Sequence, residues 1–207
     1  METLTGKGEI ATLAVLAGGA GSRMGGPKAQ LMLDGVPILE RLVTRLRWNG
    51  PTLLVTSPGR TRPPGAEAFD REVVDSVAGE GPLRGVLTAL AAAERQMIVC
   101  LTVDMPAIEA AHVRWLADAL QERPAVLGLL CDRRVADVQA IEPFPSAFRR
   151  GALAFVAAAL AAQRRSVHGL LREPGFSTIE VPADWPERTW TNLNHPADLA
   201  AFLRKGT

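Results

Sequence analysis

Cysteine and histidine are scarce in this 207-residue sequence, which has two of the former and three of the latter. Cys100 and Cys131 lie in separate apolar segments, without C-x-x-C spacing or a nearby histidine. Isolated thiols of this kind are typical of reduced core residues in the cytosol, so we expect a cytoplasmic protein without a disulfide framework. His112 has no acidic or Cys partner in metal-ligand spacing, and we interpret it as a surface or packing residue. No Ser-His-Asp or Cys-His constellation is evident, so a protein nucleophile is not expected.

An excess of charge and long apolar runs are also missing. The net charge of +1, without a basic excess, argues against a nucleic-acid partner. The N-terminal apolar run, residues 10–17, has no basic lead-in like that of a signal peptide, and no window approaches the roughly 18 to 20 apolar residues of a membrane helix. We therefore predict one globular domain over residues 1–207, with a flexible segment at 1–9, no membrane partner, and a monomer or weak oligomer.

What the chain does have is a glycine-rich loop. The stretch LAGGAGSRMGGPKAQLML, residues 16–33, places five glycines, Arg23, Pro27 and Lys28 within eleven residues. Glycines let backbone N–H groups approach phosphate oxygens, and the two basic residues add donors and positive charge. The loop therefore predicts a phosphate cradle that includes Gly19, Gly21, Arg23 and Lys28.

Two common glycine loops are excluded by spacing. The dinucleotide fingerprint G-x-G-x-x-G fails because Met24 stands where its third glycine should be. The P-loop G-x-x-x-x-G-K-[ST] fails because Pro27 replaces its lysine and Ala29 replaces its hydroxyl residue. A loop that holds both Arg and Lys instead suits a nucleoside triphosphate wrapped from several sides.

A carboxylate at a strand end supplies the counterpart of this loop. Residues 97–103 are almost uninterrupted in apolar character, as expected of a central parallel strand, and Asp104 follows them. Open α/β sheets bind ligands at the carboxyl ends of their strands. Mg²⁺ takes one or two carboxylates and completes its shell with phosphate oxygens and water, so we predict that Asp104 is a metal ligand. Arg23, Lys28 and Asp104 form the predicted catalytic set.

Apolar segments of strand and helix character alternate along the chain, which predicts an α/β three-layer sandwich with a mainly parallel sheet. The predicted strands cover residues 10–17, 52–56, 72–75, 97–103, 124–130, 135–141 and 177–181, with a tight turn at 131–134. The predicted helices cover residues 36–48, 82–95, 109–121, 145–162 and 196–203. The turn-rich segment 57–65 carries Arg60 and Arg62, each of them either a phosphate ligand or a plain surface residue.

Four motifs resemble, in order, those of the molybdenum cofactor guanylyltransferases, which are MobA-like nucleotidyltransferases with a glycosyltransferase-A-like fold. They are LAGGAGSRMGGPK at 16–28, GPLRG at 81–85, TVDMP at 102–106 and NLNHPADL at 192–199. The resemblance implies transfer of GMP from GTP to the terminal phosphate of molybdopterin, with release of pyrophosphate and Mg²⁺ as cofactor. It makes Asn192 and Asn194 candidate contacts for the metal or the acceptor. It adds to the nucleotide site Leu16, Ala17, Gly18, Asp75, Gly81, Pro82 and Gly85.

Two departures from the family pattern leave alternatives open. Pro27 stands where the family usually has Asp, as in the cytidylyltransferase and sugar-phosphate branches, and residues 136–139 replace its His-Pro pair. The sequence allows three interpretations of this segment. Asp137 or Gln139 contacts the acceptor, or Asp137 supplies a second carboxylate to the metal, or the segment is an edge strand without a role in the site. Another substrate pair is open as well, either CTP with molybdopterin or an NTP with a sugar or alcohol phosphate. An alternative of another class is a nucleotide-binding or cofactor-handling module without transferase activity.

Overall fold

The computed structural model describes residues 11–19, 21–135 and 138–204. Seven strands within these ranges form one sheet in the order β5-β4-β1-β6-β8-β7-β9, and two short strands pair separately. Neighbours in the sheet run parallel except at β8, which is antiparallel to β6 and β7. The strands of the sheet are β1 (Ala11–Leu16), β4 (Thr52–Thr56), β5 (Arg71–Val74), β6 (Met97–Thr102), β7 (Gly128–Val135), β8 (Val138–Arg149) and β9 (Phe176–Glu180). The short pair is β2 (Met32–Leu33) and β3 (Val36–Pro37).

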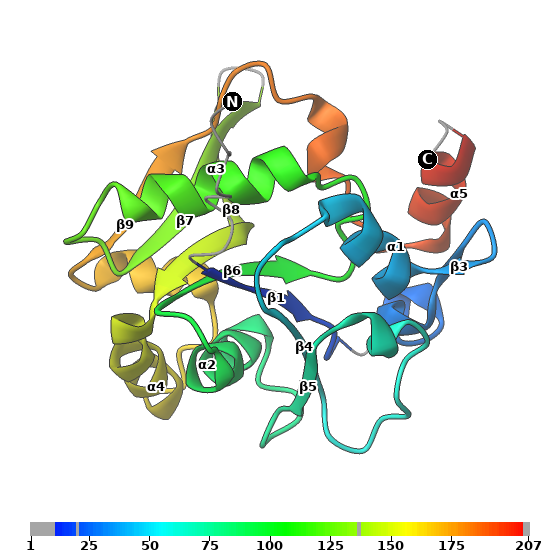
Figure 1. Cartoon of the computed structure of the whole chain (residues 1–207), viewed down its shortest axis with the longest axis horizontal. Coiled ribbons are helices and arrows are strands. Elements are labelled where there is room, and N and C mark those ends of the chain that lie inside the picture. Colours follow the sequence, from blue (N-terminus) through cyan, green and yellow to red (C-terminus); the bar gives the residue numbers. More distant parts are fainter. Residues whose placement is uncertain (1–10, 20, 136–137, 205–207) are drawn as a thin grey trace, which may run out of the picture.

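Helices cover both faces of this sheet and give it three layers (Figure 1). Helices α2 and α4 pack together on one face, whereas α3 crosses β6 and β8 on the other and meets α1. The α-helices are α1 (Ile38–Leu46), α2 (Pro82–Ala92), α3 (Ala110–Gln121), α4 (Leu153–Ala161) and α5 (Pro196–Arg204). The 3-10 helices are η2 (Ser22–Met24), η3 (Lys28–Gln30), η4 (Ala66–Ala68), η5 (Arg150–Ala152), η6 (Val167–Arg172) and η7 (Glu187–Trp190). The predicted three-layer α/β sandwich with a mainly parallel sheet is confirmed.

The two central strands are apolar because helices cover them from both sides. Every residue of β1 is buried, and so is β6 from Met97 to Leu101. A parallel strand between two helical layers requires such a run, since neither of its faces meets water. Cys100 and Cys131 are both buried and free, as the sequence predicts. In the part of the chain that is described, no helix combines the length and the apolar character needed to cross a membrane.

The segment between α3 and α4 differs from the sequence prediction. The tight turn predicted at 131–134 is wrong, because these residues lie inside β7. The helix predicted over 145–162 is wrong in its first part, because residues up to Arg149 belong to β8 and α4 begins only at Leu153. The other predicted strands and helices are present, with ends that differ by at most five residues, except that the strand predicted at 135–141 continues to Arg149 as β8.

Candidate active site

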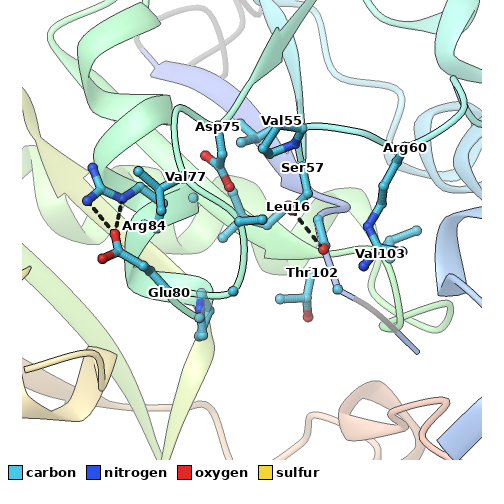
Figure 2. A pocket seen from close by; sticks show the side chains of 18 of the residues that line it. Leu16, Val55, Ser57, Arg60, Asp75, Val77, Glu80, Arg84, Thr102 and Val103 are labelled. Carbon is cyan, nitrogen blue, oxygen red and sulfur yellow. Dashed lines mark hydrogen bonds and ion pairs between the residues drawn. The ribbon is translucent and has the colours of Figure 1, made fainter. Parts of the chain in front are cut away.

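A pocket of about 520 Å³ opens at the carboxyl edge of the sheet. Its wall is formed where β1, β4, β5 and β6 end and by the loop that leads into α2 (Figure 2). This is the edge at which open α/β sheets bind ligands, and the volume lies within the range of small-molecule sites. The predicted site residues that line the pocket are Leu16, Gly18, Gly19, Lys28, Asp75, Gly81, Pro82, Gly85 and Asp104. The structure therefore brings together three motifs that lie far apart in the sequence.

Two glycines shape the loop that follows β1. Gly21 has a φ of +61°, a conformation that side chains disfavour, and its carbonyl accepts hydrogen bonds from Met24 and Gly26. At Gly18 a Cβ would lie 2.6 Å from Ser57 Oγ, which donates a hydrogen bond of 2.9 Å to the Gly18 carbonyl. The loop is thus folded on itself and fastened to the end of β4.

Lys28 joins the glycine loop to two other segments. Its Nζ lies 2.5 Å from Asp104 Oδ2, at the end of β6, and 2.7 Å from Asn194 Oδ1, in the segment before α5. The backbone N–H of Leu193 donates to the Asp104 carbonyl, which holds this last segment against β6. The side chains of Lys28 and Asp104 are only 16% and 14% exposed, so a partly buried ion pair lies at one end of the pocket.

Asp104 also meets the requirements of a cation ligand. Its Oδ1 atom is buried and has no hydrogen-bond partner among the described residues. A buried acceptor without a partner is costly, which favours a ligand that satisfies it. No cluster of three or more His, Cys, Asp or Glu side chains that could hold a metal is found among the described residues. A hard cation such as Mg²⁺ suits this single carboxylate, because phosphate oxygens and water complete its shell.

Asp75 faces the pocket from the segment after β5 (Figure 2). Its side chain is buried, and Oδ1 has no hydrogen-bond partner among the described residues. Burial raises the pKa of this carboxyl, and a hydrogen bond from Thr88 and the charge of Arg84 oppose the rise. Asp75 Oδ1 can therefore accept a hydrogen bond from a ligand, for example from an N–H group of a base or a hydroxyl group of a ribose.

The remaining predicted residues lie outside the pocket wall. Arg23 is exposed on η2, Gly21 shapes the loop, and Ala17 is buried beneath it with its N–H donating to Val55. Asn192 is turned toward the Trp190 carbonyl, to which it donates at 3.2 Å.

Gln139 lies apart from this site. It donates to Asp132 at 2.5 Å beside a separate cavity of about 260 Å³ that is lined by Asp132, Arg134, Gln139 and Glu180. Asp137 lies outside the described residues, so its suggested roles stay predictions.

Several residues of the pocket wall were not assigned from the sequence. Ser57 follows β4 directly, and its position at the end of a parallel strand is the signal that would have found it. Glu80 and Arg84 form an ion pair on the wall, and their i,i+4 spacing across the start of α2 is a usable sequence signal. The sequence leaves open for Arg60 and for Arg62 whether each is a phosphate ligand or a surface residue. In the structure Arg60 lines the pocket and Arg62 does not.

No side chain of the described wall is positioned as a nucleophile. Burial raises the pKa of both cysteine thiols, Cys100 and Cys131, and neither lines the pocket. His112 is buried away from it, where Nδ1 accepts the backbone N–H of Glu109 at 3.0 Å and completes a capping box for α3. The prediction that His112 is a packing residue is confirmed.

Comparison with known proteins gives a consistent family. The family model for the MobA-like NTP transferase domain matches residues 13–177. A probable molybdenum cofactor guanylyltransferase of Opitutus terrae is 34% identical over 93% of this chain and 94% of its own length. One from Deinococcus radiodurans is 31% identical over 94% of this chain and 95% of its own length.

Solved structures share the fold at lower sequence identity. The molybdopterin-guanine dinucleotide biosynthesis protein A of Archaeoglobus fulgidus superposes with a TM-score of 0.76 at 19% identity, over 94% of this chain and 97% of that one. The 2-C-methyl-D-erythritol 4-phosphate cytidylyltransferase of Thermus thermophilus gives a TM-score of 0.70 at 18% identity, over 93% of this chain and 96% of that one.

Proposed function

This chain belongs to the MobA-like NTP transferase family, and from that premise we propose that it transfers GMP from GTP to the terminal phosphate of molybdopterin. The products are pyrophosphate and the guanine dinucleotide form of the molybdenum cofactor. The protein is a nucleotidyltransferase, and the relatives from Opitutus terrae and Deinococcus radiodurans are probable molybdenum cofactor guanylyltransferases. The single observation that carries the proposal is the pocket in which Lys28 and Asp104 meet at one end and Asp75 faces the other wall.

The reaction needs no covalent enzyme intermediate. A phosphate oxygen of the acceptor attacks the α-phosphorus of GTP, and the bond from that phosphorus to the bridging oxygen of the β-phosphate breaks. Pyrophosphate leaves with the electron pair of this bond. The protein contributes by holding the two reactants in line and by neutralising the charge of the leaving group. Lys28 lies where it can serve the triphosphate, and the buried cysteines are not needed.

A divalent metal is general in nucleotidyltransferases of this kind, and we propose Mg²⁺. Asp104, through its unpartnered Oδ1, is the residue that would hold it. When bound, such an ion neutralises phosphate charge and acts as a Lewis acid. The assignments of Arg23 to the triphosphate and of Asn192 and Asn194 to the acceptor or the metal are part of the same proposal.

Titration calorimetry with GTP, CTP, UTP and ATP in the presence of Mg²⁺ tests the nucleotide. We expect GTP to bind most tightly, and a clear preference for CTP would support instead the cytidylyl alternative that Pro27 leaves open. Release of pyrophosphate on incubation with GTP and molybdopterin tests the transfer itself. Binding without release of pyrophosphate would favour a nucleotide-binding module or transfer to a sugar or alcohol phosphate, whereas release supports transfer to molybdopterin.

A further inference from the structure

Arg60 projects into the nucleotide pocket from the loop that follows β4. It is part of the pocket wall, together with Ser57, Pro58 and Gly59 of the same loop. Gly59 has a φ of +71°, which turns the chain just before Arg60. Figure 2 shows the guanidinium group directed toward the end of β6 at Val103, on the side of the pocket opposite Glu80 and Arg84. Arg60 therefore points toward the strand end that Asp104 follows in the chain.

The neighbouring arginine provides a contrast. Arg62 Nε donates to Glu72 Oε2 at 2.9 Å, and Arg62 does not line the pocket. Within the described part of the chain, Arg60 makes no hydrogen bond or ion pair, and its side chain is exposed. The two arginines of one loop thus have different surroundings, and only Arg60 offers free donors to a ligand in the pocket.

The charges on the pocket wall make Arg60 distinctive. The cationic residues of the described wall are Lys28, Arg60 and Arg84. Lys28 is paired with Asp104, and Arg84 is paired with Glu80. Arg60 is therefore the cation of the described wall that no carboxylate compensates. Arg23, which the glycine loop suggests as a phosphate ligand, is exposed outside the wall.

We propose that Arg60 binds the β- and γ-phosphates of the nucleotide substrate and, with Lys28, forms a two-sided clamp on the triphosphate. This inference rests on the proposed nucleotidyl transfer. Guanidinium presents five N–H donors in a planar fork that matches phosphate oxygens, and an unpaired Arg loses no competing ion pair on binding them. The hydrogen bond from Ser57 Oγ to the Gly18 carbonyl fastens the Arg60 loop to the phosphate cradle, which fixes the two sides of the clamp relative to each other.

The test compares Arg60→Ala, Arg60→Lys and the matched control Arg62→Ala by titration calorimetry with Mg²⁺ and GTP, GDP or GMP. In Arg60→Ala we expect the Kd for GTP to rise about tenfold to a hundredfold, because a hydrogen bond to a charged group is lost. The Kd for GMP, which has no β- or γ-phosphate, should stay within about twofold of the wild type. Arg60→Lys should restore part of the GTP affinity, and Arg62→Ala should bind all three nucleotides as the wild type does. Thermal unfolding of each variant checks the fold.

Four results would overturn the inference or separate it from the proposed function. Wild-type affinity of Arg60→Ala for GTP, or an equal loss for GTP and GMP, would overturn the role on the outer phosphates. If the wild type prefers CTP, the GTP assignment fails, and the series CTP, CDP and CMP decides the role of Arg60 in the same way. If the wild type binds no nucleoside triphosphate, both the proposed function and the inference fail.

Discussion

Replacing Lys28 by methionine removes one charge from the ion pair at one end of the pocket while it keeps most of the side-chain volume. In the structure, Lys28 Nζ contacts Asp104 Oδ2 at 2.5 Å and Asn194 Oδ1 at 2.7 Å. Loss of one electrostatic contact to a transition state raises a barrier by roughly 2 to 4 kcal/mol. We therefore expect turnover to fall by a factor of about 30 to 1,000 in Lys28→Met, and likewise in Asp104→Asn.

The same variants have a separate effect on stability. Loss of one partner from a fully buried ion pair costs about 3 to 5 kcal/mol, whereas exposed pairs contribute at most about 1 kcal/mol. The side chains of Lys28 and Asp104 are 16% and 14% exposed, which lies between these limits. Each single variant should therefore lose about 1 to 3 kcal/mol of unfolding free energy. The double variant should lose less than the sum, because neither of its residues leaves an uncompensated charge.

Urea unfolding of the wild type, Lys28→Met, Asp104→Asn and the double variant gives the coupling energy between Lys28 and Asp104. Pyrophosphate release gives the turnover of each protein. A coupling energy near zero would show that the ion pair does not form in solution. Turnover at the wild-type rate in folded Lys28→Met would exclude Lys28 from the phosphate site. The coupling energy and the turnover can therefore contradict the ion pair and the phosphate contact separately.

Two further predictions concern a glycine of the loop that follows β1 and the buried histidine of α3. Gly18→Ala should cost about 1 kcal/mol of stability and weaken nucleotide binding, because its Cβ would lie 2.6 Å from Ser57 Oγ and would turn this hydroxyl away from the Gly18 carbonyl. Gly19→Ala, whose Cβ meets no described atom within 4 Å, should cost less stability. Equal unfolding midpoints in urea for the two variants would contradict this. Burial lowers the pKa of His112 below 6.5, and the charge of Arg45 adds to this effect while that of Glu109 opposes it. The unfolded chain thus binds the proton more tightly, so stability should fall as the pH drops below 6.5, by at most about 1.4 kcal/mol per pH unit, and His112→Gln should flatten this dependence in unfolding curves measured between pH 7.5 and 5.

Burial explains why much of the fold was predictable from the sequence. β1, β4 and β6 lie inside the sheet and are buried on both faces, and their apolar runs identify them directly. The strand predicted at 52–56 has the same bounds in the structure, and the strand predicted at 97–103 differs by one residue. Strand ends in such a sheet converge at one edge, which is why Asp104 and the glycine loop could be assigned to the same site.

The two strands of the β7–β8 hairpin were predicted with the wrong bounds, because the charged residues of the segment 131–134, which lies within β7, mimic a turn. Beyond the core its side chains pair across the strands: Arg133 contacts Glu142 at 2.7 Å, and Gln139 contacts Asp132 at 2.5 Å. Such cross-strand pairs stabilise a strand through polar side chains, so no hydrophobic periodicity marks them. Phe148 is fully buried in β8 next to an alanine-rich helix, so the local composition favoured a longer helix than the one that forms. Pairing of β8 with β6 and β7 overrides that local preference.

The contacts of Lys28 also bear on how the free site and the loaded site differ. Without ligand, the ammonium group satisfies one oxygen of Asp104 and leaves the other unpartnered. Two partly buried charges that compensate each other cost less than two isolated ones, so the ion pair lets the site be formed before the substrate binds. The pair also competes with the ligand, since a phosphate that draws Lys28 away must offer at least as favourable a contact. A polyphosphate that brings its own divalent cation offers both partners at once, anionic oxygens for Lys28 and a cation for Asp104. A phosphate without a cation offers only one of them, and we therefore expect this arrangement to select the metal-bound triphosphate over the free nucleotide.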